Sequence, residues 1–127
     1  MKAFGRAALR AVELIKKCDI KPPEAWDLAI SEMTPQKSVR EKGCPRSAFL
    51  GLCEEGLVIC VEKKPRGTYT KSVLNKQHAI DAIHYLIHRP DSCNEPNKIW
   101  KEIAGNKKHN SQMDVVCSLW KFGLIDK

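Results

Sequence analysis

The two halves of this 127-residue chain carry the same series of features in the same order, and this repeat limits the fold more than any other property. Each half opens with an apolar stripe at helical spacing, reaches a tryptophan through a proline-containing linker, and ends with a helix that a glycine closes. The matching residues are Ala8, Ala11, Val12 and Ile15 with Ala79, Ala82, Ile83 and Leu86, Trp26 with Trp100, Ser47 with Ser111, and Gly56-Leu57-Val58 with Gly123-Leu124-Ile125. Such a repeat predicts two copies of one unit that bury a shared face.

Apolar residues at i, i+3, i+4 and i+7 predict three helices in each half. They span about residues 3–17, 23–32 and 45–55 in the first half, and 75–87, 97–104 and 111–122 in the second. Between the halves, a β-branched run at 57–61, a charged turn with Pro65 and Gly67, and a second extended run at 68–70 predict a β-hairpin. The sequence thus predicts a mainly α fold with one β-hairpin, built from tandem three-helix (helix-turn-helix-like) units. Residues 1–72 form the first unit with the hairpin, and residues 73–127 form the second without one, packed on the first as one compact body.

The positive charge of the chain is concentrated in one segment. The formal net charge is +7, and residues 59–77 contribute five Lys/Arg against one Glu, which is more than half of the excess. A local excess of this kind suits an anionic partner such as a nucleic acid or an acidic protein. No apolar run approaches the roughly 20 residues that span a bilayer. The first ten residues look like a helix start and not a signal peptide, so we expect a cytoplasmic protein without a membrane partner.

Residue types that carry catalysis or bind metals are present but not arranged for it. Cys53, Cys60 and Cys117 lie in apolar runs and no Cys-x-x-Cys pair occurs, so we expect reduced thiols, with these three buried. His84 and His88 stand at i, i+4, a spacing that can bind metal, but no accompanying Glu forms a zinc-protease motif. Phosphate loops, serine nucleophile elbows and clustered carboxylate pairs are absent from the sequence. We therefore expect no enzyme, no cofactor and no bound metal.

The order of elements in the first half resembles a known class of domain. Three helices, a Leu-x-x-x-Gly-Leu-Val segment at 52–58 and a charged hairpin at 63–69 resemble a winged helix-turn-helix domain over residues 3–71, with a wingless copy after it. The stretch at 43–57 also looks like a small family of uncharacterised bacterial proteins, which carries no function with it. In winged helices the third helix commonly enters the major groove, while the wing touches phosphates or the minor groove.

The resemblance implies a small nucleic-acid-binding regulatory protein, with duplex DNA favoured over RNA. Phosphates would be contacted by cations of the wing and of the turn before the third helix, which are Lys63, Lys64, Arg66 and Lys71, and Lys37, Arg40, Lys42 and Arg46. Arg46 and Ser47 are the side chains suited to reading bases. Against this interpretation, the third helix is expected to expose Glu54 and Glu55, and an acidic pair repels DNA.

An alternative hypothesis of another class is a protein-binding adaptor or inhibitor that uses the same scaffold and takes an acidic protein as its partner. Such a protein would bind through the groove between the two copies. Trp26, Trp100 and Trp120 would then be partly exposed as anchors, because tryptophan is enriched in binding hot spots. Buried tryptophans and a continuous positive surface would instead favour the nucleic-acid hypothesis.

Overall fold

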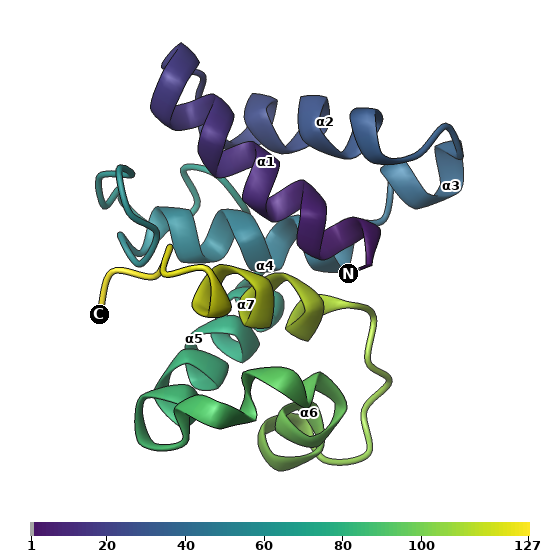
Figure 1. The fold of residues 1–127 in the computed structure, drawn as a ribbon, viewed down its shortest axis with the longest axis vertical. Helices are drawn as coiled ribbons and strands as arrows, with labels where there is room; N and C mark the ends of the chain where they lie inside the picture. The colour runs from purple at the N-terminus through teal and green to yellow at the C-terminus, as the bar shows by residue number, and fades with distance from the viewer. Residues whose placement is uncertain (1) are drawn as a thin grey trace.

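The chain folds into helices joined by short connections, with one longer loop between the two halves. In the computed structural model, which describes residues 2–127, the elements are α1 Ala3–Cys18, α2 Pro22–Met33, α3 Lys37–Arg40, α4 Gly43–Glu54, α5 Val73–His88, the 3-10 helix η1 Pro90–Asn94, α6 Pro96–Ala104 and α7 Gln112–Lys121. The six predicted helices are confirmed to within two residues at each end; the one-turn α3 was not predicted. Figure 1 shows α4 and α7 across the middle of the molecule, with α1 and α2 on one side and α5 and α6 on the other.

The central helix α4 is buried on nearly all sides. Its residues 48–54 are all buried, because α2, α5 and α7 pack around it. Leu50, Leu52 and Phe49 are fully inaccessible to solvent, as core residues are expected to be. A recognition helix must expose side chains to a DNA groove, and this third helix of the first half exposes side chains only near its first turn.

The two halves meet through contacts that follow the sequence repeat. Val58 and Ile125, which are 67 residues apart, face each other in a single antiparallel bridge. The flanking hydrogen bonds obey the same offset, since the Ile59 N–H donates to the Leu124 carbonyl at 3.0 Å and the Asp126 N–H donates to the Leu57 carbonyl at 2.8 Å. The two donors, Ile59 and Asp126, are 67 residues apart, and so are the two acceptors, Leu57 and Leu124. The two segments are thus related by a local two-fold axis at the bridge.

A second pair of contacts obeys the same relation. A Cβ on Gly5 would overlap the Ser118 side chain, so α1 and α7 approach closely there. A Cβ on Gly51 would lie 2.7 Å from the Cβ of Lys76, so α4 and α5 approach equally closely. Gly5 and Lys76 differ by 71 residues, as do Ala8 and Ala79, and Gly51 and Ser118 differ by 67, as do Gly56 and Gly123. Each half therefore packs its third helix on the first helix of the other half; the division of the chain at residue 72 stays a prediction.

The predicted hairpin, and with it the wing, is wrong. Residues 59–72, which we call the basic loop, contain no helix or strand, and residues 2–127 hold no strand pairing beyond the single bridge. The first expected strand donates and accepts its backbone bonds with the C-terminal segment instead of with residues 68–70. The second expected strand directs the N–H groups of Tyr69 and Thr70 to the carboxylate of Glu54. The backbone groups that would pair the two strands of a hairpin are therefore bonded to other partners.

Glu54, at the end of α4, fixes the basic loop to the core. Its side chain is fully buried, which corrects the expectation that Glu54 is exposed; Glu55 is half-buried. The Oε1 atom accepts from the Tyr69 N–H at 2.9 Å and the Thr70 N–H at 3.4 Å, and the Oε2 atom accepts from Lys76 Nζ at 2.7 Å. The Glu54 carbonyl also accepts from the Lys64 N–H at 2.9 Å. One residue thus binds both arms of the loop and the start of α5.

The protonation state of Glu54 follows from these contacts. Burial raises the pKa of the Glu54 carboxyl, but the hydrogen bonds from Lys76 and from the backbone of the loop outweigh burial and leave the pKa below its usual 4.5. Because the folded state favours the charged form, the carboxylate contributes stability above about pH 4.5, and this stability is lost as the pH falls through the lowered pKa.

Removing the positive partner of this carboxylate should be costly. We expect Lys76→Met to lower the free energy of unfolding at pH 7 by about 3–5 kcal/mol, since a buried charge is left without its counterion. Below pH 4.5 the difference from the parent should shrink, because a protonated Glu54 no longer needs the ammonium group. Chemical denaturation at pH 7 and pH 4 measures both effects. Lys37→Met, at an exposed pair with Glu41, is the control and should change stability by no more than about 0.5 kcal/mol. A Lys76 variant as stable as this control would contradict the role given to Glu54.

Candidate nucleic-acid interface

The nine residues predicted to contact nucleic acid fall into two groups in the structure. The first group lies on the basic loop and consists of Lys63, Lys64, Arg66 and Lys71. The second lies on α3 and at the start of α4 and consists of Lys37, Arg40, Lys42, Arg46 and Ser47. One contact links the segments that carry the two groups, since the hydroxyl of Thr70, next to Lys71, donates to Ser47 Oγ at 3.2 Å. The contact places the end of the basic loop beside the first turns of α4.

The cations of the basic loop are weakly paired, and all are exposed except Lys64, which is half-buried. Lys63 Nζ lies 3.9 Å from Glu55 and Lys64 Nζ lies 3.9 Å from Glu62, distances typical of loose surface ion pairs. Within residues 2–127, neither Arg66 nor Lys71 has a carboxylate within 4.0 Å. Since the loop is held by Glu54 from below, these side chains project from a fixed backbone and remain free to bind an anion.

Two shallow hollows adjoin the basic loop at the start of α5. One has a volume of about 340 Å³ and is lined by Lys63, Lys64 and Arg66 together with Val73. The other, of about 300 Å³, is lined by Arg66 and Lys71 and again by Val73. Val73 is 56% exposed and its neighbour Leu74 is 55% exposed. The positive surface therefore has an apolar edge, which a purely phosphate-binding surface does not require.

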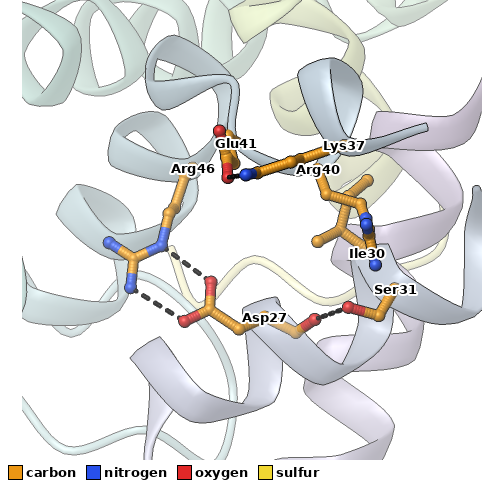
Figure 2. Close-up of a pocket in the computed structure, with 7 residues that line it drawn as sticks. All are labelled: Asp27, Ile30, Ser31, Lys37, Arg40, Glu41 and Arg46. Carbon is orange, nitrogen blue, oxygen red and sulfur yellow. Dashed lines mark hydrogen bonds and ion pairs between the residues drawn. The ribbon is translucent and has the colours of Figure 1, made fainter. Parts of the chain in front are cut away.

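The second group of cations borders a larger pocket between α2, α3 and α4, shown in Figure 2. The pocket has a volume of about 530 Å³, and we call it the basic pocket; its lining residues are Asp27, Ile30, Ser31, Lys37, Arg40, Glu41 and Arg46. Three of the predicted site residues are thus brought together by a helix, α3, that the sequence did not reveal. Lys42 is not among them and lies over the ring of Phe4, with Nζ 5.5 Å from the ring centroid.

The two residues predicted to read bases both have hydrogen-bond partners within the protein. The Arg46 guanidinium binds both oxygens of Asp27, at 3.0 and 3.3 Å (Figure 2), in the forked geometry that arginine prefers with carboxylates. Ser47 is half-buried and its hydroxyl oxygen accepts from Thr70. Base reading by Arg46 and Ser47 stays a prediction, and it would require Arg46 to leave Asp27.

Two residues that shape the site were missed by the sequence reasoning. Asp27 pairs with Arg46, and Lys76 pairs with Glu54. Asp27 gave no signal, because an acidic residue on an exposed helix face is ordinary. The partner of Lys76 did give a signal. Glu54 lies three residues after Gly51 and four after Leu50, so it shares their apolar helix face, where a charge requires a partner.

The tryptophans and thiols are placed mainly in the interior. Trp26 is fully buried and Trp100 is 5% exposed, so two of the three anchors expected for a protein-binding groove are not available; Trp120 is half-buried. All six cysteines are free thiols, and Cys53 and Cys117 are buried as predicted. Burial raises the pKa of Cys117 to about 12. Cys60 is exposed, which corrects the expectation that it is buried.

Two histidines are exposed on α5, and His109 belongs to a hydrogen-bonded group at the start of α7. His84 and His88 are both exposed on α5, and within residues 2–127 no three His, Cys, Asp or Glu side chains converge as metal ligands. His109 has a structural role, because the Met113 N–H donates to its Nε2 at 3.0 Å at the start of α7. Its Nδ1 then carries the proton and donates to Asn97 Oδ1 at 3.1 Å, while the ring stacks on Trp100 with centroids 5.1 Å apart.

The fold and the site together define an all-α protein with a positively charged loop and a basic pocket on its surface. Over residues 2–127, no helix has both the length and the apolar composition needed to cross a membrane. The chain belongs to DUF6979, a family of unknown function, which it matches over residues 1–126. No curated protein and no solved structure matches it.

The capping role of His109 predicts a pH dependence of stability. Burial lowers the pKa of His109 from 6.5, with smaller contributions from neighbouring charges. The folded state therefore favours the neutral ring, and stability that is complete above pH 6.5 is lost as the pH falls below it. The loss over the first pH unit cannot exceed about 1.4 kcal/mol for one histidine. We expect His109→Gln to be less stable at pH 7.5 but to lose less stability than the parent between pH 7.5 and 5.5. Chemical denaturation at both values measures this, and His84→Gln, at an exposed position, should keep the slope of the parent.

Proposed function

We propose that this protein binds nucleic acid through contacts between the basic loop and phosphate groups, with duplex DNA as the favoured form. The observation that carries the proposal is that Lys63, Arg66 and Lys71 stand exposed on a loop whose backbone is bound to the core through Glu54. Fixed cations bind phosphate without the entropic cost of ordering a flexible loop. Condensed counterions released from the nucleic acid add to the affinity.

The same observations argue for binding without sequence preference. Phosphate contacts fix position but carry no sequence information, which comes from side chains at base edges. The residues 48–54 of α4 are buried and the guanidinium of Arg46 is engaged with Asp27. The proposed activity is therefore a non-catalytic, cofactor-independent association with the nucleic-acid backbone. The burial of Trp26 and Trp100 removes two of the three anchors on which a protein-binding groove between the halves was expected to depend.

A second candidate function remains, because one observation favours it. Val73 and Leu74 each expose more than half of their surface, and Val73 lines the same hollow as Arg66 and Lys71. An acidic protein segment with apolar side chains would use both the charges and this apolar edge, whereas phosphates would use only the charges. Recognition of such a segment is the alternative to nucleic-acid binding at the same loop.

The basic loop should supply a large part of the affinity for a duplex. We expect the triple variant Lys63→Gln, Lys64→Gln and Arg66→Gln to bind any duplex more weakly and to reduce the slope of log K against log salt by about two to three units. Thermal stability should hardly change, because these side chains are exposed and weakly paired. The measurement is a titration of labelled duplexes of two unrelated sequences at several salt concentrations.

The matched control removes the same charge elsewhere. Lys98→Gln, Lys101→Gln and Lys108→Gln replace three exposed lysines in and after α6 and should change the salt slope by less than one unit. A parent protein that binds no duplex at low salt would contradict the proposed function. A triple loop variant that binds as well as the parent would assign the binding to another surface.

The apolar edge distinguishes the two candidate functions. We expect the double variant Val73→Ser and Leu74→Ser to keep the parent's duplex affinity within about twofold, because neither side chain bears a charge. The same titration measures this. A loss of affinity of tenfold or more, with the fold intact by circular dichroism, would show that the apolar edge belongs to the binding surface and would count against a phosphate-only interface.

A further inference from the structure

The basic pocket has an unsatisfied donor that its own residues do not explain. Arg40 Nε is shielded from solvent and has no hydrogen-bond partner. Within residues 2–127, no protein atom accepts a hydrogen bond from the other side-chain nitrogens of Arg40, and no carboxylate lies within 4.0 Å of them. Buried polar groups in folded proteins are nearly always paired, so the buried Nε–H of Arg40 calls for an explanation.

The other charges of the basic pocket are already engaged with one another. Arg46 is bound at two points to Asp27 on one wall, and Lys37 lies 3.8 Å from Glu41 on another. Figure 2 shows these pairs on different sides of the hollow, with Arg40 on a further side next to Ile30 and Ser31. Three cations and two carboxylates leave the pocket with one formal positive charge, which belongs to Arg40.

This arrangement selects the chemistry of an occupant. A guanidinium offers donors in a planar fork and no acceptor, so it binds oxyanions. A single uncompensated charge is matched by a monoanion. A phosphomonoester, which carries close to two negative charges near neutral pH, would leave an excess negative charge beside Asp27 and Glu41. A phosphodiester carries one negative charge and leaves two oxygens free to accept from Arg40.

We infer that the basic pocket is a seat for one phosphodiester, with Arg40 as the donor that binds it. Lys37 can serve as a second donor to the phosphodiester, because its ion pair with Glu41 is long and both side chains are well exposed. The inference rests on the proposed function for the source of the phosphodiester, which is the backbone of a nucleic acid. Thr70 at the end of the basic loop donates to Ser47, the residue after Arg46 of the pocket, and the inference is that one duplex backbone contacts both the pocket and the loop.

The seat can be tested on the intact protein with a minimal ligand. Spectra of the arginine Nε–H groups of the full chain would be recorded during titration with dimethyl phosphate, a monoanionic phosphodiester, with Arg40→Lys identifying the Arg40 signal by its loss. We expect the Arg40 signal to shift to saturation while that of Arg6, an exposed arginine on α1, does not. Neutral trimethyl phosphate should have no effect. An Arg40 shift no larger than that of Arg6, or acetate binding as tightly as dimethyl phosphate, would overturn the inference.

A second arm of the experiment uses the nucleic acid. Arg40→Gln should weaken duplex binding about five- to tenfold at 0.1 M salt and reduce the salt slope by about one unit, the effect of one lost phosphate contact. Lys101→Gln on α6 removes an equal charge and should do neither. If the parent binds duplex and Arg40→Gln matches Lys101→Gln, the seat is wrong while the proposed function stands. If the parent binds no duplex, the proposed function fails, and the dimethyl phosphate titration alone decides the seat.

Discussion

The position of the basic loop depends on the hydrogen bonds that the buried carboxylate of Glu54 accepts. A charge in the core is tolerated only when several donors satisfy it, and here the donors come from Lys76 and from two backbone N–H groups of the basic loop. If the loop left the core, the Oε1 atom would lose both of its backbone donors, and Lys76 would be the one partner left to the carboxylate. A segment that lacks helix and strand is in this way held in one position, with its lysines and arginine directed to solvent. The buried charge of Glu54 and the exposed cations are therefore linked, because the same loop binds the one and carries the others.

The local two-fold relation between the halves shows which features are shared and which are special to one half. The bridge between Val58 and Ile125 and the close contacts at Gly5 and Gly51 obey the repeat. They account for how two small units bury one core, since neither half could bury enough surface alone. Glu54 does not obey it, because the equivalent position 67 residues later is Lys121. This departure from the repeat lies beside the proposed interface, because Glu54 binds the basic loop.

The sequence predicted the helices well because each presents an apolar stripe with helical spacing, and glycines closed α4 and α7 where expected, with Gly56 and Gly123 at positive φ. It failed at the hairpin because residue types indicate that a segment is extended but not which acceptor its N–H groups will find, and here the acceptor is a side chain. The pocket was only partly foreseen. Lys37, Arg40 and Arg46 were recognised as a basic set, but their convergence depends on α3, a single turn too short to leave a periodic signal. The pairing of Arg46 with Asp27 depends on a distance of 19 residues along the chain, which no local pattern encodes.

Hydrogen exchange of the loop amides tests the central claim most directly, because it reports whether the loop is bound to Glu54 in solution. If the carboxylate holds the loop, the amide protons of Tyr69 and Thr70 should exchange far more slowly than that of Arg66 at the tip, which donates to no acceptor among residues 2–127. They should also lose this protection in Glu54→Gln, which keeps the size of the side chain but not its charge. Tyr69 and Thr70 amides that exchange as fast as Arg66 in the parent protein would contradict the account.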